Sequence, residues 1–149
     1  MKFLMTIYLV LMTVVFSHAQ TETLPIKWSF RAEPEKEAGV YTIYATAMIE
    51  AGWHVFAPIP GGDGLLIPTQ ITLDQPELYR DLGNLQAEGK EIHQEMDGVG
   101  LVHFFEKQVT LKMTVHTDKT KVFKGFVTFQ LCNEKMCLPP SDQSFEIKL

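Results

Sequence analysis

Apolar and polar side chains alternate along much of this chain, and the alternation limits the folds that the chain can adopt. In the stretch 109–116, Val109, Leu111, Met113 and Val115 are separated by single polar residues. Residues two apart lie on the same face of a β-strand, so this stretch would have one apolar and one polar face. Because the sequence contains no convincing long helix, we predict an all-β protein.

The same alternation recurs in about seven segments, which are separated by turn signals at short intervals. We expect strands at 26–31, 41–49 with a continuation at 52–56, 69–73, 101–105, 109–116, 123–131 and 145–149. Residues 57–68 contain three prolines and three glycines and are predicted to form a loop. Residues 33–39 have the composition of a hairpin connection, and the weakly patterned segment 76–89 predicts a turn of helix or an irregular edge. This arrangement favours an immunoglobulin-like antiparallel β-sandwich.

The N-terminus has the parts of a secretory signal peptide. Lys2 provides a positive charge, residues 3–16 are almost entirely apolar, and small residues occupy the −3 and −1 positions before the expected cleavage after Ala19. We expect a signal peptide at 1–19 and a mature single domain at 20–149; the alternative is an uncleaved N-terminal anchor. The mature protein is therefore predicted to be periplasmic or secreted, in an oxidising environment where two cysteines can pair.

The charge balance limits the range of partners. The 13 basic and 18 acidic residues give a formal charge of −5, and the loss of Lys2 with the signal peptide changes the balance to 12 − 18 = −6. This mild acidity argues against nucleic acid or anionic lipid as a partner. No later segment is long and apolar enough for a transmembrane span, and we expect a monomer.

Both cysteines lie near the C-terminus, in the segment VTFQLCNEKMCLPP. A Cys132–Cys137 disulfide would close a short loop, for which chain entropy predicts a stabilisation of roughly 2 kcal/mol, against about 4–5 kcal/mol for a loop of a hundred residues. If the alternation of the preceding strand continues, Cys132 points outward with Thr128 and Gln130, which would put the pair at a sheet edge or rim. A short disulfide that solvent can reach suits thiol–disulfide exchange better than it suits a structural role.

The spacing of the cysteines leaves two alternatives open. One is a non-redox immunoglobulin-like binding module in which the disulfide is only a staple. The other is a copper or zinc site, as in a copper-handling domain, whose soft ligands would be Cys132, Met136 and Cys137 with any of His54, His93, His103 or His116. No pair of these histidines has a recognisable metal-binding spacing, and the aromatic neighbours of His54 and His103 favour packed or hydrogen-bonded side chains. We therefore predict no metal and no cofactor.

Three stretches of the chain resemble the N-terminal domain of the thiol:disulfide interchange protein DsbD. WSF at 28–30 resembles the opening strand of that family. IEAGWHVF at 49–56 resembles a family strand in which a glycine is followed by an aromatic residue and then by Tyr or Phe. FQLCNEKMCLPP at 129–140 resembles its Tyr-Gln-x-Cys…Cys-x-Pro-Pro signature, which is the specific one of the three. The resemblance covers about 26–149, and we expect a stand-alone secreted protein without the membrane and thioredoxin-like domains of the family.

The resemblance implies an immunoglobulin-like fold whose two cysteines cycle between dithiol and disulfide. By position, Cys137 would form the mixed disulfide with a partner, and Cys132 would resolve it. In this role the protein would be an electron carrier and not an independent catalyst. Because the charges of Glu134 and Lys135 offset each other, we expect the partner to provide the attacking thiolate.

The resemblance also implies a cap loop that covers the cysteines, at about 95–100. Met96 or Val99 would take the place of the family's aromatic residue, and Gly98 would lie in the turn. Trp53 and Phe56 either line the site or belong to the core.

The partners follow from the same resemblance. A thioredoxin-like domain or protein would donate electrons. Oxidised periplasmic proteins, such as disulfide isomerases or cytochrome c maturation factors, would accept them.

Overall fold

The computed structural model describes residues 23–149, and the predicted signal peptide at 1–19 lies outside these residues. The strands are β1 (Ile26–Pro34), β2 (Val40–Ile49), β3 (His54–Gly61), β4 (Gln70–Leu73), β5 (Asp81–Leu82), β6 (Gln86–Met96), β7 (Gly100–His116), β8 (Val122–Phe129), β9 (Leu131–Cys132) and β10 (Ser141–Lys148). A turn of 3-10 helix, η1 (Pro76–Leu78), precedes β5. None of the helical structure in the described residues has the length and hydrophobicity of a membrane span.

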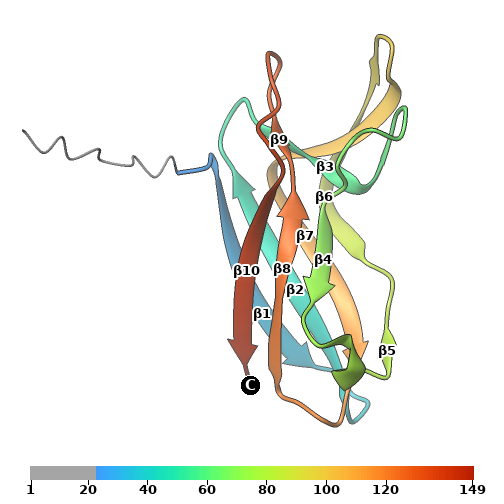
Figure 1. Cartoon of the computed structure of the whole chain (residues 1–149), viewed down its shortest axis with the longest axis vertical. Helices are drawn as coiled ribbons and strands as arrows, with labels where there is room; N and C mark the ends of the chain where they lie inside the picture. Colours follow the sequence, from blue (N-terminus) through green and yellow to red (C-terminus); the bar gives the residue numbers. More distant parts are fainter. Residues whose placement is uncertain (1–22) are drawn as a thin grey trace, which may run out of the picture.

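The strands form two antiparallel sheets that face each other (Figure 1). The larger sheet has the order β1-β2-β7-β3-β9, and β5 and β6 also pair with the long β7. The smaller sheet has the order β10-β8-β4 and lies in front of the larger one in Figure 1. The prediction of an all-β, immunoglobulin-like antiparallel sandwich is therefore confirmed.

The main core lies between the two sheets and is built from the apolar faces of alternating strands. Ile43 on β2 and Leu111 on β7 are fully buried, as is Phe123 on β8. Aromatic rings connect the two layers, with centroids 5.4 Å apart for Trp28 and Phe129. Burial of these faces supplies the main favourable term for folding, because it scales with the apolar area removed from water.

Residues 57–61 were expected in a loop, and that prediction is wrong, because they continue β3. Pro58 and Pro60 cannot donate a ladder hydrogen bond. The strand accommodates them at an irregularity, where its register against β7 shifts between Phe56 and Gly61. The expected strands 101–105 and 109–116 also form one continuous strand, β7, which runs through the polar residues between them.

The chain changes sheets at Gln130. β8 ends at Phe129 in the smaller sheet, and β9 pairs with β3 in the larger sheet, with Leu131 opposite Val55 and Cys132 opposite His54. The predicted strand 123–131 is therefore too long by the residues that cross over. This crossing sets the orientation of the cysteine pair.

Candidate functional site

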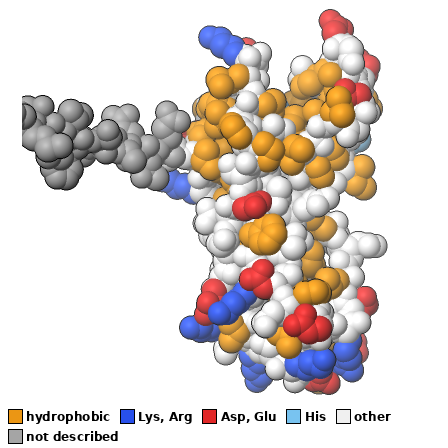
Figure 2. Space-filling model, in the orientation of Figure 1, with side chains coloured by type: hydrophobic (Ala, Val, Ile, Leu, Met, Phe, Trp, Pro, Cys, Tyr) orange, Lys and Arg blue, Asp and Glu red, His pale blue; other side chains and the backbone are white. Residues whose placement is uncertain are grey.

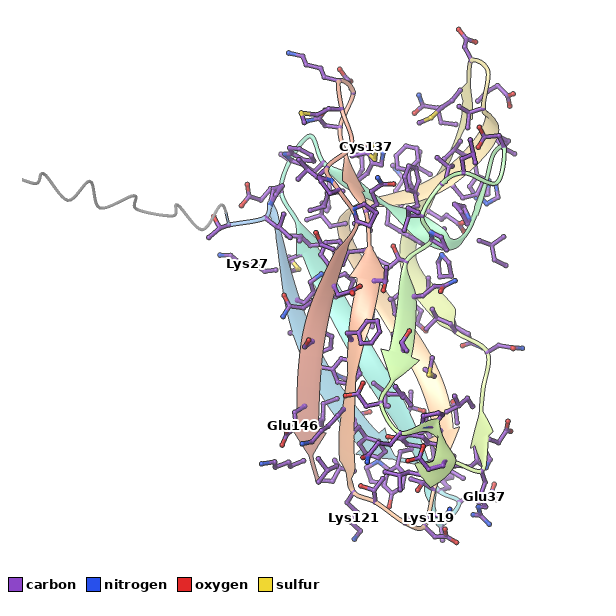
Figure 3. All side chains as sticks on the ribbon, in the orientation of Figure 1. Lys27, Glu37, Lys119, Lys121, Cys137 and Glu146 are labelled. Atoms are coloured by element: carbon purple, nitrogen blue, oxygen red, sulfur yellow. A yellow bond between two sulfur atoms is a disulfide. The ribbon has the colours of Figure 1, made fainter. Side chains whose placement is uncertain are left out.

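The two cysteines form a disulfide at one end of the sandwich. The Cα atoms of Cys132 and Cys137 are 4.0 Å apart, and the two residues also form an antiparallel bridge. In Figure 3, Cys137 lies at the opposite end of the molecule from Glu37, Lys119 and Lys121. Cys132 lies on β9, the last strand in the order of the larger sheet, and Cys137 pairs with it from the loop that follows.

Hydrogen bonds fix the short loop between the cysteines. The Asn133 side chain accepts hydrogen bonds from the backbone N–H groups of Lys135 and Met136, at 2.8 and 2.9 Å. Such a side-chain turn is a common use of asparagine in loops. On the far side of the disulfide, the Leu138 N–H donates to the Leu131 carbonyl at 2.8 Å. None of these hydrogen bonds involves the sulfur atoms.

The two cysteines differ sharply in exposure. Cys132 is only 2% exposed, whereas Cys137 is exposed. As the alternation predicted, Cys132 faces away from the main core, but its side chain is covered and not open to solvent. Leu131 packs in the main core and Cys132 packs on the opposite face of β9, so both residues are buried.

Cys132 belongs to a second, smaller core, which we call the cysteine cluster. It consists of the buried residues Phe56, Val102, Phe104 and Cys132, with Leu66, Ile92, Met96 and Val99 packed against it. β3 has four consecutive buried residues here, because one of its faces contacts the main core and the other contacts this cluster. The disulfide therefore lies outside the space between the two sheets.

The turn between β6 and β7 is the segment predicted to cap the site. Met96 and Val99 both pack against the cysteine cluster, and the Val99 N–H donates to the Met96 carbonyl at 3.0 Å. Gly98 lies at the tip with a φ of 76°, a conformation that glycine adopts without strain. A Cβ atom on Gly62 would lie 3.0 Å from side-chain carbons of both Leu66 and Val99, so the neighbouring loop packs closely on this turn.

The structure separates the two aromatic candidates. Phe56 is part of the cysteine cluster, where its backbone pairs with that of Phe104. Trp53 packs against the main core instead.

His54 is a site residue for which the sequence predicted only a packed or hydrogen-bonded role. It lies directly opposite Cys132 on the neighbouring strand, so the two side chains share a face. The ring is packed near Phe104, with centroids 4.4 Å apart, and its Nε2 atom is buried without a hydrogen-bond partner among the described residues. Burial lowers the pKa of His54, and the charge of Glu106 opposes this effect. The cross-strand pairing could not be read from the sequence, because β9 is only two residues long.

The structure brings one histidine close to the predicted soft-metal ligands. His54 neighbours Cys132, whereas His116 is the last residue of β7. His93 and His103 lie opposite each other on β6 and β7, one residue away from Ile92 and Phe104 of the cysteine cluster and therefore on the other face of the hairpin.

Apolar side chains are exposed around this end of the molecule. Leu65 is 81% exposed, Met136 is 54% exposed and Leu101 is 48% exposed. Figure 2 shows hydrophobic side chains gathered at the upper end, between and below two projections. Figure 1 shows that these projections are the loop after β9 and the β6–β7 hairpin. Exposed apolar patches of this kind commonly mark docking surfaces.

The family model for the N-terminal domain of the thiol:disulfide interchange protein DsbD matches residues 18–149. The chain belongs to this family. A search of curated protein sequences finds no match.

Two solved structures are similar to this DsbD N-terminal domain. The N-terminal periplasmic domain of ScsB from Proteus mirabilis has a TM-score of 0.60 and 15% identity over 83% of this chain, which spans only 45% of that chain. The DsbD N-terminal domain of Neisseria meningitidis, in its reduced form, has a TM-score of 0.55 and 18% identity over 72% of this chain and 76% of that one. At these identities the two likenesses establish the fold.

The DsbD family and the disulfide together indicate thiol–disulfide exchange as the chemistry of this end of the molecule. Exchange begins when a thiolate attacks one sulfur of a disulfide, so access to each sulfur decides which is attacked. Here the chain presents one exposed and one buried cysteine.

Proposed function

We propose that this protein is a periplasmic thiol–disulfide exchange carrier. It takes reducing equivalents from a thioredoxin-like donor and passes them to oxidised periplasmic proteins, such as disulfide isomerases or cytochrome c maturation factors. The observation that supports this proposal best is the unequal exposure of the two cysteines of one disulfide.

Reduction of the carrier takes two steps. A donor thiolate attacks the Sγ atom of exposed Cys137, the Cys137–Cys132 bond breaks, and Cys132 leaves as a thiolate. The second donor thiol, as its thiolate, then attacks the donor sulfur of the mixed disulfide. The donor leaves oxidised, and both cysteines of the carrier are reduced, so two electrons have moved.

Transfer to the acceptor reverses these steps. The Cys137 thiolate attacks the acceptor disulfide and forms a mixed disulfide. Cys132 then attacks Cys137, re-forms the original bond and releases the acceptor as a dithiol. Burial beside Phe56 and Phe104 suits Cys132 to this internal step, because another protein has little access to it.

The cap is proposed to limit which thiols reach the site. Met96 and Val99 pack on the cluster that holds Cys132, and Gly98 allows the turn to be tight. A docking partner can displace such a turn more readily than it can displace a core strand, because the end of a hairpin opens locally at a lower free-energy cost than a strand inside a sheet. The exposed side chains of Leu65, Leu101 and Met136 would contact the partner.

We also propose that the protein is exported and that residues 20–149 fold as one domain. The N-terminal pattern predicts cleavage after Ala19, which leaves residues 20–149 as the mature chain. A disulfide in the structure fits an oxidising compartment, where such bonds persist.

Two measurements test the exchange function. In a redox titration, the Cys132/Cys137 pair should have a potential within the range of thioredoxin-family proteins, about −120 to −270 mV. Cys132→Ala should form a mixed disulfide through Cys137 with an oxidised thioredoxin-like protein. Cys137→Ala is the matched control, and its buried Cys132 should form that adduct far more slowly.

A potential well below about −300 mV, together with no trapped adduct, would contradict the carrier function. Reduction would then lower the melting temperature but leave partner binding intact. That outcome would instead support a binding module with a structural disulfide.

A further inference from the structure

The β6–β7 hairpin has a second face, which points away from the cysteine cluster. Ile92 and Phe104 point toward the cysteine cluster, while their neighbours His93 and His103 point the other way. His93 and His103 are directly opposite each other in the antiparallel pair, so their side chains are adjacent. Glu91 is two residues before His93 on the same strand, and it therefore shares this face.

A β-bulge creates this arrangement. Before the bulge, Gly89 on β6 is opposite Val109 on β7, and a continuation of that register would place His93 opposite Phe105. After the bulge the register has shifted by two residues, which puts His93 opposite His103. Bulges often occur beside functional sites, where they redirect side chains.

The three side chains already converge. The imidazole rings of His93 and His103 are stacked, with centroids 4.2 Å apart. Glu91 places one carboxylate oxygen 3.5 Å from Nδ1 of His103 and the other 3.7 Å from Nε2 of His93. One potential ligand atom from each of the three residues lies within 4.8 Å of the others. Two ligands of a tetrahedral zinc ion with bonds of about 2.0–2.1 Å are roughly 3.4 Å apart, so only small side-chain rotations are needed.

We propose that Glu91, His93 and His103 bind a divalent transition-metal ion of the Zn²⁺ type. Two imidazoles and a carboxylate are a ligand set that zinc accepts, and the fourth position would hold water. Imidazole ligands also distinguish this site from an all-oxygen site for Ca²⁺ or Mg²⁺. The side chains are 39%, 54% and 26% exposed, respectively, so an ion can enter from solvent.

The metal would link β6 to β7 directly behind the cap. The reverse face of the same segment packs on the cysteine cluster through Ile92 and Phe104. A bound ion would therefore stiffen the hairpin, because it adds coordinate bonds across the strands to the ladder hydrogen bonds and side-chain contacts already present. The site contains neither cysteine, so binding does not depend on the redox function.

The test is a calorimetric titration of the oxidised protein with ZnCl₂, in a buffer that does not chelate metal. We expect one equivalent of Zn²⁺ to bind. His93→Ala and His103→Ala should each weaken binding by roughly 10–100-fold or more, since even residues that only orient ligands have effects of this size. Glu91→Gln should weaken binding in the same direction. His116→Ala, which removes a histidine at the far end of the same strand, is the matched control and should bind normally.

A second readout locates the ion. Zn²⁺ should shift the imidazole nitrogen resonances of His93 and His103 in NMR spectra and leave those of His54 and His116 unchanged. The absence of stoichiometric binding would overturn the proposal. So would binding that survives in the His93→Ala/His103→Ala double variant, provided that its circular dichroism spectrum shows a folded protein.

Discussion

Cys132 shares a row of the larger sheet with two ionisable side chains. His54 lies between Cys132 on β9 and Glu106 on β7. Its Nε2 atom is buried among aromatic rings and has no hydrogen-bond partner in the described part of the chain. A buried imidazole without a partner is poorly placed to carry a charge, because burial disfavours the protonated form.

This burial predicts that acid weakens the fold. Burial lowers the pKa of His54, so the unfolded chain binds a proton at this residue at a higher pH than the folded protein does. The free energy of unfolding should therefore fall as the pH drops through the unfolded pKa of about 6.5, and this loss should level off below the folded pKa. His54→Phe should remove this component. Urea denaturation of the oxidised proteins at several pH values would measure the difference.

Glu106 provides a variant with the opposite effect. Its charge raises the pKa of His54, so Glu106→Gln should make the acid-dependent loss of stability larger. Parallel pH curves for the wild type, His54→Phe and Glu106→Gln would show that His54 does not contribute.

At the residue scale, the sequence and the family resemblance suggested candidate site residues but did not predict the surroundings of those residues. The cysteines and the cap residues could be chosen from spacing and resemblance. The burial of Cys132 could not be predicted, because the side chains that cover it come from strands far away in the sequence. The pairing of His93 with His103 depends on a bulge that no local sequence pattern announces.

The turn between β6 and β7 is the element whose removal should matter most for reactivity. Met96→Ala/Val99→Ala deletes the two partly buried side chains that pack on the cysteine cluster. Their burial contributes about 1–2 kcal/mol, so reduction of the disulfide by dithiothreitol should accelerate by roughly tenfold if the cap limits access. Leu82→Ala, on β5, deletes an exposed leucine and should leave the rate unchanged. Equal rates in all three proteins would show that the turn does not shield the pair.

The loop that carries the disulfide should depend on it only modestly. Reduction opens a very short loop, so the free energy of unfolding should fall by about 2 kcal/mol. The hydrogen bonds of Asn133 and Leu138 do not involve sulfur and should persist. Urea denaturation of the oxidised and reduced forms would check the first expectation, and amide exchange at Met136 and Leu138 would check the second. A loss of 4 kcal/mol or more would identify the bond as a main support of the fold.

Elements with a clear apolar alternation could be predicted, and those without it could not. β2, β4 and most of β8 were expected close to where they lie. β6 was not expected as a strand over its whole length, because it lies against β7 with most of its side chains exposed and therefore lacks an alternating apolar pattern. The pairs of residues that form β5 and β9 are too short to leave a periodic signal.

The molecule as a whole has two cores of unequal size. The main core joins both sheets, whereas the cysteine cluster lies on the other side of β3. The overall sandwich was predictable, since alternating strands with frequent turns favour it. The second core was not predictable. A strand with two buried faces resembles an uninterrupted apolar run, and the prolines and glycines in the second half of GWHVFAPIPGG suggested a loop.

Two cores of different size should open separately. We expect the amides of β2 and the second half of β7 to exchange with solvent only through global unfolding, and those near the tip of the β6–β7 hairpin to exchange through local opening. Phe129→Ala, which removes a ring from the main core, should cost about 3–5 kcal/mol and accelerate the first group. The hairpin tip should be unaffected. Uniform acceleration across both groups, measured by hydrogen–deuterium exchange, would show a single cooperative unit.

The hydrogen bonds that hold the loop between the cysteines do not involve sulfur, so the loop should keep its shape in both redox states. A partner that binds this surface would then meet the same backbone shape in the dithiol and in the disulfide form of this protein. Binding would then not depend on the redox state of the cysteines. The direction of electron transfer would be set by the relative amounts of reduced donor and oxidised acceptor proteins. Such a protein would equilibrate electrons between the donor and acceptor proteins without selecting the direction of transfer.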